Sequence, residues 1–143
     1  MSAKRADYAH VLPIPTRWND NDVYGHVNNV EYLAFFDTVI NRWLIEEGGL
    51  DIAGGPTIGL CAESGCTYHA ALVFPQVVDA ALRVAHLGRT SVRYEVGLFA
   101  QGSDEPAGTG FFVHVFVDRG ERRPAPIEGD LREALERLRV GSS

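Results

Sequence analysis

Cysteine is scarce in this chain of 143 residues, which contains only Cys61 and Cys66. If both lie on one strand, their spacing puts the two side chains on opposite faces of it, where they do not readily pair or bind one metal ion. The sequence therefore gives no sign of a disulfide framework, and two buried thiols in a reducing cytoplasm are expected.

Long apolar runs and an excess of basic residues are also missing. No apolar run approaches the roughly 18 residues of a transmembrane helix. Residues 1–10 lack the apolar stretch of a secretory signal peptide. We therefore expect a cytoplasmic protein that does not span a membrane. The 13 Lys and Arg residues against 19 Asp and Glu residues give a net charge of -6, which argues against nucleic acid as the main partner. A local basic patch for a small anionic ligand is still compatible with this charge.

The composition that remains is that of one globular domain spanning residues 1–143. Hydrophobic residues make up 45% of the chain and charged residues 22%. A chain of this length buries about two-thirds of its surface on folding, which is enough for a self-sufficient core. Neither a disordered chain nor a second domain is expected.

The clearest element is a helix over residues 29–47. Asn28 is placed to cap it, Glu31 stands where a capping box requires an acidic residue, and two glycines follow its end. Apolar residues cover most of its circumference, whereas a surface helix has only one apolar face. The sequence therefore predicts that other elements wrap around this helix.

The remaining pattern is mostly that of strands. Pro13 and Pro15 suit an edge strand over residues 8–18, because the amides on that side need no partner. The almost wholly apolar segment 111–117 indicates a strand covered on both faces. The other predicted elements are strands over 57–69, 77–86 and 91–100 and a short helix over 130–139. This order predicts an α+β fold, an antiparallel sheet curled around one helix, and it excludes alternating βαβ units.

The densest polar cluster, residues 17–29, leads directly into the long helix. Asp20, Asp22 and His26 lie in this segment, close to the free amides and positive dipole end of the helix N-terminus. A carboxylate beside polarising amides is what hydrolysis of an activated acyl group requires. Two other interpretations remain open: an Asx-rich turn that only caps the helix, and a metal site on these three side chains.

The spacing in this cluster carries a family resemblance. Two aspartates two apart are followed by a glycine, the run His-Val-Asn-Asn and a tyrosine; the positions are Asp20, Asp22, Gly25, His26, Val27, Asn28, Asn29 and Tyr32. The motif resembles the helix-entry motif of hotdog-fold acyl-CoA thioesterases, near 4-hydroxybenzoyl-CoA thioesterase and the bacterial long-chain acyl-CoA thioesterases. The resemblance extends through the segments 63–68, 88–91 and 122–126. The aromatic-acyl branch has Pro-Ala-Gly after the aspartate, so Val23-Tyr24-Gly25 moves the match toward the fatty-acyl branch.

The resemblance implies a fold, a reaction and an assembly. The expected fold is the hotdog, a long central helix wrapped by a five-stranded antiparallel sheet. The expected reaction is hydrolysis of acyl-CoA to free acid and CoA, with neither cofactor nor metal. The family assembles as homodimers or homotetramers whose sites lie at subunit interfaces, and it pairs subunits through the edge of the strand after the long helix.

It also implies roles for individual residues. Asp22 corresponds to the general base or nucleophile, and the amide near Asn29 corresponds to the group that polarises the thioester carbonyl. His26 has no fixed role in the family: it orients Asp22, binds water, or only hydrogen-bonds in the turn.

Substrate contacts follow from the same resemblance. Arg89, with Thr90 and Ser91, corresponds to the turn that meets the CoA phosphates, for which a guanidinium is well suited. Glu63 either positions water in the partner's site or is a solvated edge residue. Tyr24, Tyr32 and Phe36 are expected to line an apolar tunnel along the helix, unless they are plain core.

Two alternatives to a thioesterase remain. A hotdog enoyl-CoA hydratase uses an Asp/His pair about five residues apart, and here Asn21 occupies that position before His26. A non-catalytic acyl-CoA-binding hotdog protein would keep the pocket without turnover. The length and the aliphatic or aromatic character of the acyl group are left open.

Overall fold

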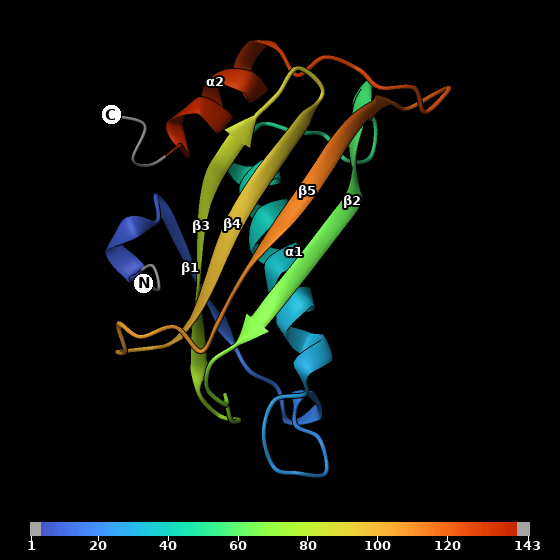
Figure 1. Cartoon of the computed structure of the whole chain (residues 1–143). Helices are drawn as coiled ribbons and strands as arrows, with labels where there is room; N and C mark the ends of the chain where they lie inside the picture. The colour runs from blue at the N-terminus through green and yellow to red at the C-terminus, as the bar shows by residue number, and fades with distance from the viewer. Residues whose placement is uncertain (1–3, 140–143) are drawn as a thin grey trace.

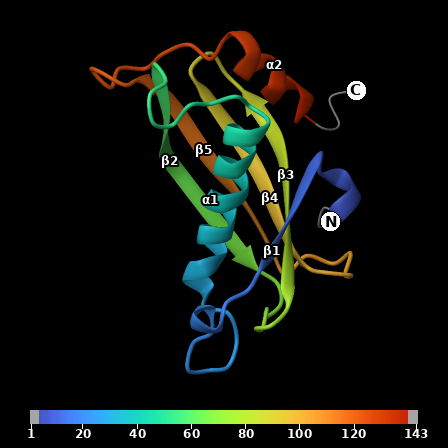
Figure 2. The ribbon, with the colours of Figure 1, turned by 180° about the vertical axis from the view of Figure 1, so that it is seen from behind.

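The computed structural model describes residues 4–139, in which one antiparallel sheet curls around one long helix (Figures 1 and 2). The elements in chain order are η1 (Arg5–Asp7), β1 (His10–Pro15), η2 (Trp18–Asp20), α1 (Asn29–Glu46), β2 (Thr57–Tyr68), β3 (Val77–Leu87), β4 (Ser91–Ala100), β5 (Gly108–Asp118) and α2 (Gly129–Arg137). The predicted α+β architecture and every predicted element are confirmed, with shifts of a few residues at the ends. Within residues 4–139, neither α-helix is both long and apolar enough to cross a bilayer.

The sheet has the order β1-β3-β4-β5-β2, so β1 and β2 are its two edges. The prediction that Pro13 and Pro15 mark an edge strand is confirmed. This strand is shorter than predicted by two residues at its start and three at its end, where η2 begins at Trp18.

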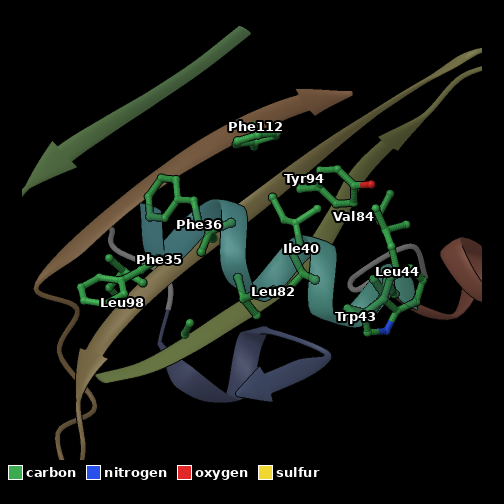
Figure 3. Packing of buried hydrophobic residues seen from close by; sticks show 14 of the residues in the cluster. Phe35, Phe36, Ile40, Trp43, Leu44, Leu82, Val84, Tyr94, Leu98 and Phe112 are labelled. Atoms are coloured by element: carbon green, nitrogen blue, oxygen red, sulfur yellow. The ribbon is translucent and has the colours of Figure 1, made fainter. Parts of the chain in front are cut away.

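Helix α1 lies across one face of the sheet and supplies much of the core (Figure 2). Figure 3 shows Phe36 and Ile40 of α1 among apolar side chains of the strands, such as Phe112. The buried residues of α1 are Tyr32, Phe35, Phe36, Val39, Ile40, Trp43 and Leu44. The sheet therefore provides the cover that the apolar circumference of this helix predicts.

Two glycines of β5 let α1 approach the sheet closely. A Cβ on Gly108 would lie 2.9 Å from Cδ2 of Tyr32, and a Cβ on Gly110 would lie 2.6 Å from Cε2 of Phe36. The two rings come from successive turns of the helix and occupy the space that side chains at 108 and 110 would fill. Glycine is thus required at both positions for the helix to pack at this depth.

The predicted placement of the two cysteines is wrong. Cys61 aligns with His114 and Cys66 with Gly110, both on the side of the sheet that faces α1. The alignment shifts by one residue between Cys61 and Glu63, and this β-bulge reverses the alternation of faces along the strand. Both cysteines are free, Cys61 is exposed and Cys66 is half-buried, so the expectation of two buried thiols is also wrong.

Strand β5 is covered on one face rather than on both. Its α1-facing residues Phe112 and Phe116 are buried, whereas Phe111 and Val113 on the other face are half-buried. The guanidinium of Arg93 lies 4.1 Å from the centre of the Phe111 ring. The described residues of one chain therefore leave the apolar outer face of this strand partly uncovered.

Candidate active site

The loop between η2 and α1 turns back on itself and places Asp22 beside the start of the helix. Asn21 and Val27 form an antiparallel bridge across the loop. Within it the N–H of Asp22 donates to the carbonyl of His26 at 2.9 Å, and the N–H of Gly25 donates to the carbonyl of Asp22 at 3.1 Å. Gly25 has a φ of 85°, a conformation that favours glycine. These bonds fix the backbone on both sides of Asp22.

The neighbouring aspartate, Asp20, has a structural role. Its side chain is 2% exposed. Its carboxylate accepts three hydrogen bonds from Arg17: from the backbone N–H at 2.7 Å, from the side-chain Nε at 3.1 Å and from the side-chain Nη2 at 2.8 Å. Its own carbonyl accepts from the N–H of Asn28 at 2.8 Å. Asp20 therefore ties the first turn of the loop to the helix cap.

The Asp22 carboxylate, in contrast, is only half-buried, with 19% of its side chain exposed. Its Oδ1 accepts from the backbone N–H of Tyr24 at 2.9 Å, and its Oδ2 lies 3.9 Å from Nδ1 of His26. That Nδ1 is also 3.4 Å from the carbonyl oxygen of Val27. One carboxylate oxygen thus holds the turn, and the other is left beside an imidazole for chemistry.

The N-terminus of α1 is capped as the sequence predicts. Oδ1 of Asn28 accepts from the N–H of Val30 at 3.0 Å, and the carbonyl of Asn28 accepts from the N–H of Glu31 at 2.9 Å. Among the described residues, none accepts a hydrogen bond from the N–H of Asn29. This amide stands at the positive end of the helix dipole and is free to bind a carbonyl oxygen.

The predicted capping box is wrong. The carboxylate of Glu31 lies 3.8 Å from Nη2 of Arg17, and the N–H of Asn28 that it would accept from already donates to Asp20. The basic side chain of the loop therefore draws Glu31 away from the cap.

Two cavities meet at Asp22 and Asn29, which line both. The inner cavity has a volume of about 260 Å³ and is lined by Asp22, His26, Val27, Asn29, Tyr32, Tyr68, Ala70 and Ala71. The outer hollow has a volume of about 750 Å³ and is lined by Trp18, Asn19, Asn21, Asp22, Val23, Tyr24, Gly25, Asn28 and Asn29. The residue that carries the carboxylate and the residue that carries the free amide thus line both a small, largely apolar cavity and a wide one.

Two tyrosines close one side of the inner cavity. The rings of Tyr32 and Tyr68 meet edge to face, with centres 5.0 Å apart and planes at 70°. The hydroxyl of Tyr68 donates to the carbonyl of Asn29 at 3.2 Å, and that of Tyr32 donates to the carbonyl of Ala70 at 3.0 Å. Tyr68 is a site residue that the sequence analysis missed, because no local signal connects it with a helix start 39 residues earlier.

The predicted acyl-binding aromatics divide between different environments. Tyr32 lines the inner cavity, as noted. Tyr24 is 81% exposed, lines the outer hollow and stacks on His26 with ring centres 6.3 Å apart. Phe36 is fully buried in the core against Gly110.

The predicted CoA-binding residues lie far from Asp22 within one chain. Arg89, Thr90 and Ser91 belong to the β3–β4 turn, which Figure 1 shows at the opposite end of the sheet from the start of α1. Arg89 is exposed. Glu63 is exposed in the middle of β2, aligned with Val113 on the face away from α1. One chain therefore does not bring these residues to the cavities.

Nearby groups that compete as nucleophiles or ligands are less suited to chemistry. Burial raises the pKa of the Cys66 thiol to about 11, so it is protonated near neutral pH. Burial also lowers the pKa of His114 to about 4; its Nδ1 lies 3.1 Å from the hydroxyl of Tyr94, within the core. In the part of the chain that the structure describes, no group of three His, Cys, Asp or Glu side chains is arranged to hold a metal ion.

The fold is the hotdog, a five-stranded antiparallel sheet around a central helix, and the site at the helix entry suits acyl-group chemistry. Residues 16–135 match the model of the thioesterase-like superfamily, and the chain belongs to this family. The resemblance to the thioesterases is thus confirmed at the level of the superfamily. No curated protein matches the chain significantly.

Solved structures agree with this assignment. The PA5185 protein of Pseudomonas aeruginosa is 53% identical, with a TM-score of 0.95 and 99% of each chain covered. The PA2801 protein of the same organism, described as a candidate thioesterase, is 32% identical with a TM-score of 0.82, covering 90% of this chain and 98% of that one. A Thermus thermophilus thioesterase in complex with coenzyme A and zinc is 26% identical with a TM-score of 0.75, covering 92% and 95%.

Proposed function

We propose that this protein hydrolyses acyl-CoA thioesters to the free acid and CoA, with Asp22 as base or nucleophile. The observation that carries the proposal is that Asp22 and Asn29, the residue whose backbone N–H has no acceptor among the described residues, line the same two cavities. Membership of the thioesterase-like superfamily supports the reaction, and the coenzyme A in the Thermus relative supports the carrier. Its location in the cytoplasm stays a prediction of the sequence.

The reaction follows from the positions of these two groups. A thioester carbonyl that accepts a hydrogen bond from Asn29 gains positive character at carbon, and the amide and helix dipole stabilise the negative charge that develops on its oxygen. Asp22 then either takes a proton from an attacking water or attacks the carbon itself to form an anhydride that water hydrolyses. In both routes the C–S bond breaks and CoA leaves as thiolate, which takes up the proton that Asp22 removed from water in the first route and a proton from solvent in the second. His26, 3.9 Å from Asp22, is placed to orient the carboxylate or the water.

We also propose that a second copy of the chain completes the site. The edge strand β2 is 12 residues long, has no proline or lysine, and carries exposed Leu60 and Tyr68. The opposite edge, β1, is short and blocked by two prolines. A long edge without proline or lysine favours pairing with another strand, and the resemblance expects a homodimer or homotetramer through this strand.

Pairing of two β2 strands supports a role for Arg89. A two-fold axis runs the paired strands antiparallel, so each copy places its β3–β4 turn at the end of the dimer where the other copy has its α1 N-terminus. Arg89, Thr90 and Ser91 of one copy would then meet the CoA phosphates bound at Asp22 of the other. The half-buried outer face of β5 is free to pack in a dimer of dimers.

The test is release of thiol from a panel of acyl-CoAs by the wild type and by Asp22→Asn. The amide oxygen of Asn keeps the bond to Tyr24 but carries no charge, so we expect an unchanged unfolding midpoint and a loss of kcat of roughly 100- to 10,000-fold. Asp37→Asn, an exposed position on α1 away from the cavities, is the matched control and is expected to retain full activity.

Near-wild-type turnover by Asp22→Asn would move the chemistry to another residue. Absence of thiol release from the whole panel, by folded wild-type protein, would contradict hydrolysis. Loss of enoyl absorbance from crotonyl-CoA would then favour the hydratase, and saturable binding without turnover would favour an acyl-CoA-binding protein.

A further inference from the structure

The inner cavity is lined in part by a pair of rings that hold each other in place. Tyr32 comes from the first turns of α1 and bonds to the carbonyl of Ala70 beyond the end of β2, while Tyr68 comes from β2 and bonds to the carbonyl of Asn29 in α1. The helix therefore anchors the strand end, and the strand anchors the helix start. Two bonds in opposite directions fix the rings more firmly than the edge-to-face contact alone.

A glycine on β5 determines where these rings lie. Gly108 aligns with Tyr68 across the β2–β5 pair. The place where its side chain would stand is filled by the ring of Tyr32, which is 3% exposed. Sγ of Cys66 lies 3.5 Å from the same point. Tyr32 thus rests on the sheet beside Tyr68 and has no room to withdraw from the cavity.

The helix beyond this pair offers no continuation for an acyl chain. The next α1 side chains that face the sheet, Phe36, Val39 and Ile40, are fully buried, and Figure 3 shows Phe36 and Ile40 packed among side chains of the strands. Along the helix, a chain that enters past Asp22 therefore meets Tyr32 and then close-packed core.

We propose that Tyr32 and Tyr68 form the floor of the acyl pocket and restrict the substrate to compact acyl groups, a short aliphatic chain or a single ring. This inference rests on the proposed thioesterase function. A cavity of about 150 Å³ holds one benzene ring, so the inner cavity, at about 260 Å³, accommodates such a group together with the thioester carbonyl. A long fatty-acyl chain has no space in it.

The first experiment measures kcat/KM with acetyl-, hexanoyl-, benzoyl- and palmitoyl-CoA for the wild type, Tyr68→Ala and Tyr68→Phe. The wild type is expected to favour hexanoyl- and benzoyl-CoA over palmitoyl-CoA. Tyr68 is 47% exposed on an edge strand, so its truncation opens the floor without emptying the core. Tyr68→Ala is expected to raise the palmitoyl-to-hexanoyl ratio at least about tenfold. The matched control Tyr68→Phe keeps the ring and is expected to keep the wild-type ratio.

Gly108→Ala, on β5, is designed to make the acyl pocket smaller, whereas Tyr68→Ala, on β2, enlarges it. The new methyl group would lie 2.9 Å from Tyr32, so it pushes the ring into the cavity and is expected to lower kcat/KM for benzoyl-CoA relative to acetyl-CoA. The inference is overturned if the wild type has the same kcat/KM for palmitoyl-CoA as for hexanoyl-CoA. It is equally overturned if folded Tyr68→Ala and Gly108→Ala both keep the wild-type ratios. Either result leaves the proposed thioesterase function intact, provided that turnover still depends on Asp22. Absence of turnover with every acyl-CoA overturns both the thioesterase function and the restriction to compact acyl groups.

Discussion

His114 is a titratable residue held neutral by its surroundings. It is 3% exposed, lies among the rings of Phe112, Phe116 and Tyr94, and has its Nδ1 3.1 Å from the hydroxyl of Tyr94. Burial lowers its pKa from 6.5 to about 4, since a charged imidazole there would lose its hydration. The histidine therefore couples the stability of the core to pH.

The direction of this coupling follows from proton binding. The unfolded chain protonates His114 near pH 6.5, whereas the folded chain does so only near pH 4. Between these values the unfolded state holds more protons, so the free energy of unfolding falls as the pH is lowered through this window, by about 3 kcal/mol in total. Urea unfolding at pH 7.5 and at pH near 4 measures this change.

The variant His114→Gln is neutral at every pH. We expect it to lose that part of the pH dependence, so its deficit in stability relative to the wild type shrinks as the pH falls. His86→Gln, at an exposed histidine of the same sheet, is expected to keep the wild-type pH dependence. Parallel curves for wild type and His114→Gln would assign the acid sensitivity to other groups.

The sequence predicts the local part of the site and misses its long-range part. Asp22, Asn28 and Asn29 follow one another in a loop and a helix start, so their positions depend on bonds between near neighbours. Tyr68 reaches the site only through the packing of β2 against α1. The faces of Cys61 and Cys66 depend on a bulge, and no residue pattern in β2 marks it.

At the scale of elements, the close packing of α1 on β5 depends on Gly110. A Cβ at this position would overlap the carbonyl oxygen of Gly65 on the neighbouring strand and lie 2.6 Å from Phe36. One of these contacts is with backbone, which cannot rotate away, so β2 or α1 must shift. Gly110→Ala is therefore expected to lower the free energy of unfolding by more than about 3 kcal/mol, at the upper end for overpacking.

Chemical denaturation of Gly110→Ala beside Gly120→Ala tests this packing. Gly120 is exposed, its backbone lies outside the left-handed region, and a Cβ there would meet only Oδ1 of Asp118 at 3.7 Å. We expect its substitution to leave stability within about 0.5 kcal/mol of the wild type. Equal stability of the two variants would mean that the sheet yields at Gly110 at little cost.

The order and type of the elements could be predicted because each has a local pattern. The apolar circumference of α1 indicates a wrapped helix, and the two prolines of β1 indicate an edge. The sheet order β1-β3-β4-β5-β2 has no such pattern. It depends on which strands close over the helix, and the long β2 edge becomes visible only once that order is known.

At the scale of the whole molecule, the fold separates two residues to which we assign contacts with one substrate. Asp22 lies in the loop before α1 and Arg89 in the β3–β4 turn, and Figure 1 shows the start of α1 and this turn at opposite ends of the sheet. In the proposed dimer, one acyl-CoA reaches Asp22 of one copy and Arg89 of the other. The proposed β2–β2 dimer therefore predicts that each site takes Asp22 from one copy and Arg89 from the other.

Mixing two variants that are each impaired in a different residue tests this prediction. Asp22→Asn removes the base, and Arg89→Ala weakens phosphate binding, which we expect to lower kcat/KM roughly 10- to 100-fold. Refolded together in equal amounts, the two variants are expected to regain about one quarter of the wild-type kcat/KM, because one quarter of the sites combine two unaltered residues. Activity equal to the mean of the separate variants would show that both residues serve a site within one chain.

A second mixture distinguishes a site shared between two copies from a site within one chain. A chain that carries both substitutions is refolded with an equal amount of wild type. If each site spans two copies, only wild-type dimers are active and about one quarter of the sites remain; if each site lies within one chain, about half remain. Sedimentation at the assay concentration confirms that dimers are present, so that a value of one half counts against the shared site rather than against assembly.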